Sequence, residues 1–182
     1  MPFPLGHAAG GLAIYELYAK NGFNMRPWKA LVFIVVLTNL PDIDVLIGLI
    51  FHSNGDIFHR GPTHSLLFSV VISALVSNAW RCWSRIPRVS FLLSLLLLLS
   101  HLFFDAIFTS APVSFWWPLE VHWSGGYSGW SDVIHSIFFG VFRDVGMTDI
   151  GIIVATGIVI VLNRLFKDMP ILVDQSRMKR NQ

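Results

Sequence analysis

Five long apolar stretches, separated by short polar or basic connections, account for most of the chain. Stretches of this length and hydropathy are typical of helices that cross or enter a bilayer. The pattern therefore predicts an all-α fold, a polytopic integral membrane bundle of about five helices that forms one domain over residues 1–182. The predicted helices cover residues 4–19, 28–51, 62–80, 89–109 and 148–166.

Two features modify this plan. Pro41 interrupts the second stretch, because proline lacks a backbone donor and pushes the preceding residue out of helical geometry, so we expect a break at Asp42. The long aromatic loop 110–146 contains apolar side chains at helical spacing over residues 131–143. We expect an amphipathic helix there, lying on the membrane surface, and a polar tail over residues 167–182.

Composition supports the membrane assignment. The chain is 54% hydrophobic and 13% charged, and its mean hydropathy of +0.62 lies outside the range of ordinary soluble domains. The single cysteine, Cys82, excludes an intrachain disulfide and a cysteine-based zinc cluster, so a metal would be held by histidine and carboxylate. A net charge of +2 gives no support for nucleic-acid binding. Because no Lys or Arg precedes Lys20, we expect no cleavable secretory signal.

The basic residues predict the orientation, since short cytoplasmic loops are enriched in Lys and Arg. Eleven of the 13 fall on one side of the five-helix plan, and only Arg60 and Arg143 fall on the other. The N-terminus and the loops 52–61 and 110–146 should therefore lie outside, and the C-terminus in the cytoplasm. Tryptophans are expected to mark the inner interface at Trp28, Trp80 and Trp83, and the outer one at Trp116, Trp117, Trp123 and Trp130.

Five polar residues from four of the predicted helices fall at one depth. A rise of about 1.5 Å per residue places them roughly 18 to 24 Å above the inner ends of their helices, in a hydrocarbon layer about 30 Å thick. Ionisable groups are costly at such depth, so by default they mark a functional site. The five are His7, Asp42, His64, His101 and Asp105.

The spacing of the polar residues suits a metal site. His101 and Asp105 are four apart and share a helix face. Asp42 and Asp44 can both turn inward if the backbone unwinds beside Pro41, as a metal pair with a bridging carboxylate requires. The plain alternatives are interhelical hydrogen bonding for the first pair and a helix cap for Asp42.

A second motif lies at residues 59–64, HRGPTH. Pro62 is expected to open the third helix, with His64 in its first turn. Unused backbone N–H groups at that helix start, with Arg60 beside them, would suit a phosphate or another anion. The alternative is an ordinary helix cap with a snorkelling arginine.

Together these motifs carry a family resemblance. His7, PDID at 41–44, HRGPTHS at 59–65, HLFFD at 101–105 and FWWPL at 115–119 resemble the YdjM-like family, described as LexA-regulated, membrane-bound metal-dependent hydrolases. The match covers roughly residues 5 to 120, with Gly6 standing where threonine is expected. The resemblance implies a metal-dependent hydrolase of the inner membrane. The order of the motifs is also loosely similar to that of zinc-dependent phospholipase C proteins.

We therefore expect a membrane-bound hydrolase in which one or two divalent ions activate water against an ester or phosphoester of a lipid-like, amphiphilic substrate. Zinc is the preferred ion, and manganese and iron are alternatives. Arg60, Asp44 and His59 are the expected catalytic residues, with Arg60 stabilising developing negative charge. The expected metal ligands are His7, Asp42, Asp44, His59, His64, His101 and Asp105.

Two other functions stay open. The chain could be a non-enzymatic carrier of metal ions or protons, or a structural membrane protein whose polar cluster fixes the helix register. A transmembrane pathway should continue inward, whereas the third and fourth helices offer only serines below the polar layer. That composition argues against a relay. Purified protein without stoichiometric metal would favour the structural role.

Overall fold

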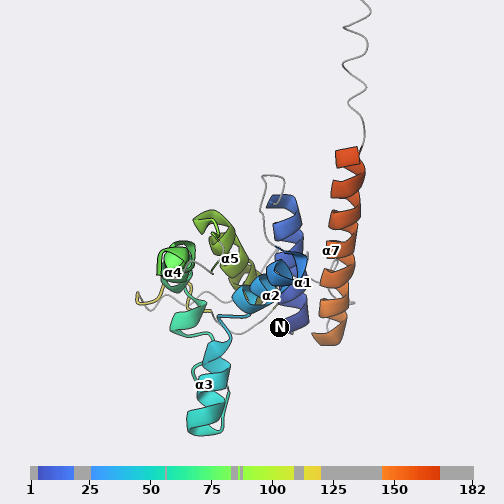
Figure 1. Ribbon diagram of the computed structural model, residues 1–182. Coiled ribbons are helices and arrows are strands. Elements are labelled where there is room, and N and C mark those ends of the chain that lie inside the picture. The colour runs from blue at the N-terminus through green and yellow to red at the C-terminus, as the bar shows by residue number, and fades with distance from the viewer. Residues whose placement is uncertain are drawn as a thin grey trace, which may run out of the picture.

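The computed structural model describes residues 4–18, 26–55, 57–82, 86, 88–108, 113–119 and 145–168. Within them the chain forms helices joined by turns, as the apolar pattern predicts (Figure 1). The elements are α1 (Pro4–Tyr18), α2 (Pro27–Thr38), α3 (Ile43–His52), the short 3-10 helix η2 (Pro62–His64), α4 (Leu66–Cys82), α5 (Phe91–Phe108) and α7 (Val145–Asp168). The surface helix predicted over residues 131–143 lies outside the described residues.

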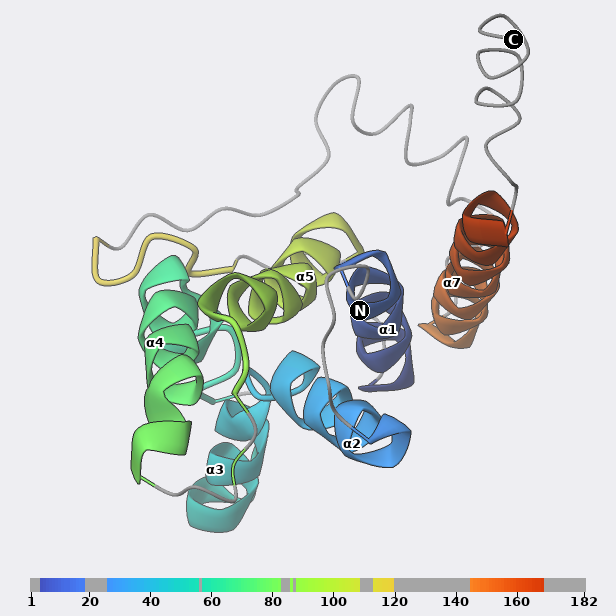
Figure 2. The same ribbon diagram turned by 45° about the horizontal axis from the view of Figure 1, so that its top comes forward.

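Helices α1 and α7 lie side by side and run in the same direction (Figures 1 and 2). Thr156 Oγ1 donates to the Ala9 carbonyl at 3.1 Å, and Asn163 Nδ2 donates to the Glu16 carbonyl at 3.2 Å. Because both pairs have the same sequence separation of 147, the two helices are parallel. This agrees with the five-helix plan, in which the first and last helices both run inward.

Two helices of the described chain are long and apolar enough to cross a bilayer, α5 and the Thr148–Phe166 part of α7. Helices α2 and α3 pass the same test as a pair but are bent by 61°, as in a broken span or a re-entrant loop. Helices α1 and α4, with 15 and 17 residues, are about 22 and 25 Å long, shorter than a hydrocarbon core of about 30 Å. The described residues therefore hold two or three candidate spans, fewer than the five predicted.

The break predicted at Asp42 is confirmed. Helix α2 ends at Thr38, a turn follows, and α3 begins at Ile43. Asp42 occupies the N-cap position of α3, but its side chain makes no capping hydrogen bond. The helix-cap interpretation of this aspartate is therefore wrong, and its carboxylate is available to the polar cluster.

The third predicted helix begins later than expected. Residues Pro62–His64 form the 3-10 turn, Ser65 is extended at φ −116° and ψ 156°, and α4 starts at Leu66. The Phe68 N–H donates to Ser65 Oγ at 3.1 Å, and the Leu66 N–H donates to the Phe115 carbonyl at 3.0 Å. Serine is a preferred N-cap residue, which explains the later start. The α-helix start on which the predicted anion site was based therefore lies at Leu66 rather than at Pro62.

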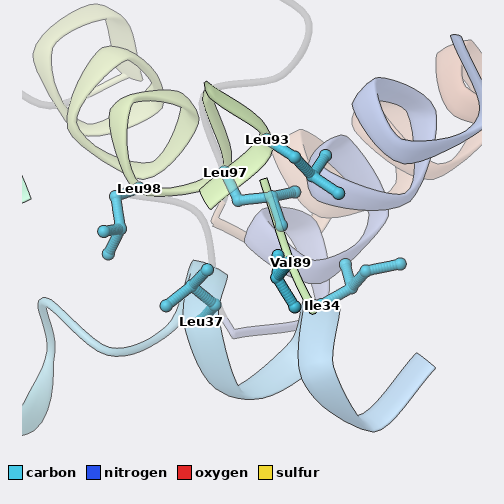
Figure 3. Packing of buried hydrophobic residues seen from close by; sticks show 6 residues of the cluster. All are labelled: Ile34, Leu37, Val89, Leu93, Leu97 and Leu98. Atoms are coloured by element: carbon cyan, nitrogen blue, oxygen red, sulfur yellow. The ribbon is translucent and has the colours of Figure 1, made fainter. Parts of the chain in front are cut away.

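An apolar core lies between α2 and the first half of α5 (Figure 3). It consists of the buried side chains of Ile34, Leu37, Val89, Leu93, Leu97 and Leu98. Gly11 of α1 packs against its edge, where a Cβ would overlap the Thr38 methyl and lie 3.1 Å from Ile34 Cγ2. Since Thr38 and His101 each follow core residues within one helical turn, the core closes the polar cluster on one side.

Candidate metal centre

The structure brings all seven predicted ligand residues into one cluster. Helix α1 supplies one, the α2–α3 break and the start of α3 supply two, the chain before α4 supplies two, and α5 supplies two. They are His7, then Asp42 and Asp44, then His59 and His64, and finally His101 and Asp105. Four of them, His7, His64, His101 and Asp105, are 0% exposed. The convergence predicted from helix depth is therefore confirmed.

Two groups of ligand atoms share one carboxylate, that of Asp105. In each group the ligand atoms lie within 4.8 Å of one another. The groups are Asp42, His59, His64 and Asp105, and His7, His101 and Asp105. Asp105 Oδ2 lies 3.4 Å from His64 Nε2, while Oδ1 lies 3.5 Å from His7 Nε2. Two oxygens that face different histidines suit a carboxylate that bridges a pair of ions.

Asp44 lies behind the histidines rather than among the ligand atoms. Its Oδ1 accepts from His59 Nδ1 at 3.3 Å, and its Oδ2 accepts from His64 Nδ1 at 3.1 Å, Thr63 Oγ1 at 2.6 Å and the Arg60 N–H at 3.2 Å. An ionised carboxylate only accepts, so each imidazole presents its Nδ1–H to Asp44, and in the neutral form of the ring Nε2 is then the atom that could bind a metal. Asp44 thus lies outside both groups of candidate ligand atoms, and its contacts suit a residue that orients His59 and His64.

His101 is oriented in the same way by the main chain. Its Nδ1 donates to the Thr38 carbonyl at 2.7 Å, which leaves Nε2 only 3.2 Å from His64 Nε2 and 3.3 Å from Asp42 Oδ1. The two Nε2 atoms are close enough to share a proton in a hydrogen bond, or, when both imidazoles are neutral with their protons on Nδ1, to share a cation. Thr38 was not identified from the sequence, because a backbone carbonyl leaves no signal in a side-chain pattern.

Several buried polar atoms of the cluster have no hydrogen-bond partner within the described part of the chain. They include both ring nitrogens of His7, Nε2 of His59, Oδ1 of Asp42 and both carboxylate oxygens of Asp105. An unpaired buried acceptor costs about 1–3 kcal/mol, and more when it is charged. Imidazole nitrogens and carboxylate oxygens are the donors that zinc, manganese and iron accept in proteins. This donor set therefore fits a divalent cation.

Arg60 reaches the cluster from the chain that precedes η2. Its Nε lies 3.9 Å from Asp105 Oδ2, and its side chain is 15% exposed. Its φ of 65° is in the left-handed region, which arginine rarely adopts. Its N–H is held by Asp44, and its carbonyl accepts from the Ser114 N–H at 3.2 Å. Two main-chain hydrogen bonds thus keep a strained residue at the edge of the cluster, as is common at functional sites.

These features define an all-α integral membrane protein with a buried histidine–aspartate cluster that could hold a metal ion. The model of the YdjM inner membrane protein family matches residues 1–169, and the chain belongs to this family. It is 36% identical over 121 residues to the inner membrane protein YbcI of Escherichia coli (strain K12), over 65% of this chain and 68% of that protein. No solved structure matches the chain. The family and the inner membrane predicted from the motifs are therefore confirmed.

Proposed function

We propose that this chain is a membrane-embedded hydrolase that binds one or two divalent metal ions and cleaves an ester or phosphoester of a lipid-like, amphiphilic substrate. The observation that carries the proposal is the concentration around Asp105 of buried ligand atoms that have no hydrogen-bond partner among the described residues. A divalent ion bound there would supply water activation and charge neutralisation.

Charge supports the same proposal. The carboxylates of Asp42, Asp44 and Asp105 lie in the cluster with the single guanidinium of Arg60. With neutral histidines these groups carry two uncompensated negative charges, which are costly to bury in a membrane protein. One divalent cation would balance them. A second would add positive charge that an anionic substrate could neutralise.

The cluster residues have separable roles in this proposal. His7, His59, His64 and His101, with Asp42 and Asp105, would hold the metal. Asp44 and the Thr38 carbonyl orient three of the histidines. Arg60 would donate hydrogen bonds to negative charge that develops on the substrate. The side chains of Asp42 and Arg60 are 16% and 15% exposed, whereas that of His59 is 6% exposed, so substrate would approach at the Asp42–Arg60 edge.

The hydrogen bonds below the cluster support hydrolysis over ion transport. Within α4 and α5 the serine hydroxyls donate to carbonyls of their own helices or of the residue that caps them. They therefore form no chain of hydrogen bonds from one helix to the next. The six side chains of the apolar core beneath His101 add no hydrogen-bonding group to such a chain.

Metal content and activity of matched variants test the proposal. Full-length protein purified in detergent should contain stoichiometric zinc, manganese or iron by elemental analysis and should turn over a member of a phosphoester and lipid-ester panel. His64→Ala and Asp105→Ala should lose metal and activity together. His52→Ala is the control, because His52 is exposed at the end of α3 and packs against Phe58 at 5.2 Å.

Two outcomes would contradict the proposal. Protein that contains no metal after purification, and binds none on titration with zinc, manganese or iron, would favour the structural role. Activity retained in metal-free His64→Ala would mean that hydrolysis does not depend on this centre.

A further inference from the structure

An apolar cavity of about 620 Å³ lies between α1, α5 and α7. On α5 it extends from Leu96 to Phe108 and on α7 from Thr148 to Val159, a length of about 17 Å. The described residues that line it include no charged side chain. Its volume lies within the range of roughly 300–1,000 Å³ that is usual for small-molecule sites.

The hydroxyls of the cavity wall do not favour a polar ligand. Ser100 Oγ donates to the Leu97 carbonyl at 2.7 Å, and Thr156 Oγ1 donates to the Ala9 carbonyl at 3.1 Å. With their protons already donated, these hydroxyls could only accept, so a polar ligand would replace few of the hydrogen bonds that it gives up to water, which is costly. A hydrocarbon chain has no such bonds to lose. An elongated apolar cavity beside two candidate spans therefore fits the tail of a membrane lipid.

One wall of the cavity is shared with the metal centre. Phe104 lines the cavity, directly precedes Asp105 in the chain, and has its ring centroid 6.1 Å from that of His7. Gly10 lines the cavity three residues after His7, and a Cβ at this position would overlap the Phe104 ring. The glycine thus allows the aromatic ring to lie flush against α1, between the cavity and the centre.

We propose that this cavity binds one acyl chain of a glycerophospholipid, whose polar head then lies at the metal centre. The part of this proposal that makes the lipid a substrate rests on the proposed hydrolase function. The part that makes the cavity a tail-binding site rests on the cavity alone. The two parts are therefore tested separately.

Two glycines of α7 provide a matched pair of variants. Gly151 lines the cavity, whereas a Cβ at Gly157 meets nothing within 4 Å. Gly151→Leu should fill the cavity, and Gly157→Leu should leave it unchanged. Ala155→Leu, on the same wall as Gly151, is the second filling variant in case the first fails to fold. Thermal unfolding in detergent identifies variants that fold.

The first measurement uses metal-stripped protein in vesicles that contain a phosphatidylcholine with a diazirine at the end of one acyl chain. Photolabelling followed by peptide mass spectrometry should find adducts on cavity residues of α5 and α7 in the wild type and in Gly157→Leu. Labelling should fall about tenfold in Gly151→Leu or Ala155→Leu, the loss expected when roughly two methylene groups are displaced from an apolar site. Equal labelling of all variants would mean contact with bulk lipid only and would overturn the proposal.

A second way to overturn the proposal is labelling confined to Phe115 and Trp116. They line a second cavity of about 480 Å³ with Leu66 and with Leu99 and Phe103, two residues that also line the first cavity. The substrate part is tested with metal-loaded protein by comparing long-chain and short-chain substrates. Gly151→Leu should lower kcat/KM about tenfold for the long chain alone. If photolabelling is selective but no substrate is turned over, the cavity binds an acyl chain and the hydrolase function is refuted. If turnover does not depend on chain length, the cavity does not determine which substrate is cleaved.

Discussion

Asp44 offers a sharp test of the metal centre, because it contacts two histidines without joining the ligand atoms. Asp44→Asn preserves the size of the side chain but replaces one of its two acceptor oxygens with an NH₂ donor. The Nδ1–H of either His59 or His64 then faces a donor. That imidazole is expected to move its proton to Nε2, which removes the lone pair that a metal ion needs.

The expected loss of metal affinity depends on how many histidines the substitution disturbs. Losing the hydrogen-bond partner behind one metal-bound histidine typically weakens metal binding about 10–100-fold, which corresponds to about 1.4–2.7 kcal/mol. Asn keeps one acceptor oxygen, so we expect a single effect of this size in Asp44→Asn. Asp44→Ala disturbs both histidines and also removes the acceptor of Thr63 Oγ1, 2.6 Å away. Its effect should therefore be larger.

Competition with a fluorescent chelator in detergent micelles measures the affinity, and thermal unfolding of the metal-free protein checks the fold. Asp42→Asn is the matched comparison, because it makes the same chemical change on a carboxylate oxygen 3.3 Å from His101 Nε2. The expected order of affinity is wild type, then Asp44→Asn, then Asp42→Asn. Wild-type affinity in Asp44→Asn, or a loss equal to that of Asp42→Asn, would refute the positioning role.

Three further predictions concern the strained arginine, the helix packing and the orientation. Arg60→Gly should retain metal content and thermal stability, because glycine accepts a φ of 65° without strain. Its turnover should fall about 10²–10³-fold, the effect of losing one oxyanion donor. Unchanged turnover would exclude Arg60 from the mechanism. Gly11→Leu should lower the free energy of unfolding by about 1–3 kcal/mol through overpacking, whereas Gly157→Leu should leave it unchanged. Equal denaturation midpoints for the two variants would show that α1 does not pack as described. Reporter fusions at Gln182 and within residues 120–130 should report opposite sides of the membrane, and two cytoplasmic signals would contradict the orientation predicted from the basic residues.

The height of polar residues along their helices was the most informative feature of the sequence. The rise of a helix converts residue number into distance at a fixed rate, so residues of four segments could be assigned to one layer before any contact was known. The structure places all five of them within the two overlapping ligand groups. The break at Asp42 was predictable for a similar reason, because proline acts locally and does not depend on the rest of the fold.

The direction in which each polar side chain points within the layer was not predictable. The side-chain direction of Asp44 depends on the bend between α2 and α3, which is 61° in the structure, and sequence spacing alone does not give that bend. Pro62 and Ser65 are both favourable at a helix start, and the sequence does not show that a 3-10 turn occupies the residues between them. The main-chain groups that hold His101 and Arg60 have no side-chain signal at all.

The apolar core covers the polar cluster on one side. The core side chains precede Thr38 and His101 on α2 and α5, so they separate the ligand atoms from the far ends of both helices. Asp42 and Arg60 are the partly exposed members of the cluster, with side chains 16% and 15% exposed. A carrier needs access from both faces of the membrane, whereas a hydrolase of amphiphilic substrates needs one polar entrance and an apolar site nearby. Substrate entry at the Asp42–Arg60 edge, with the apolar cavity nearby, would match the second arrangement, and for this reason we propose hydrolysis rather than transport.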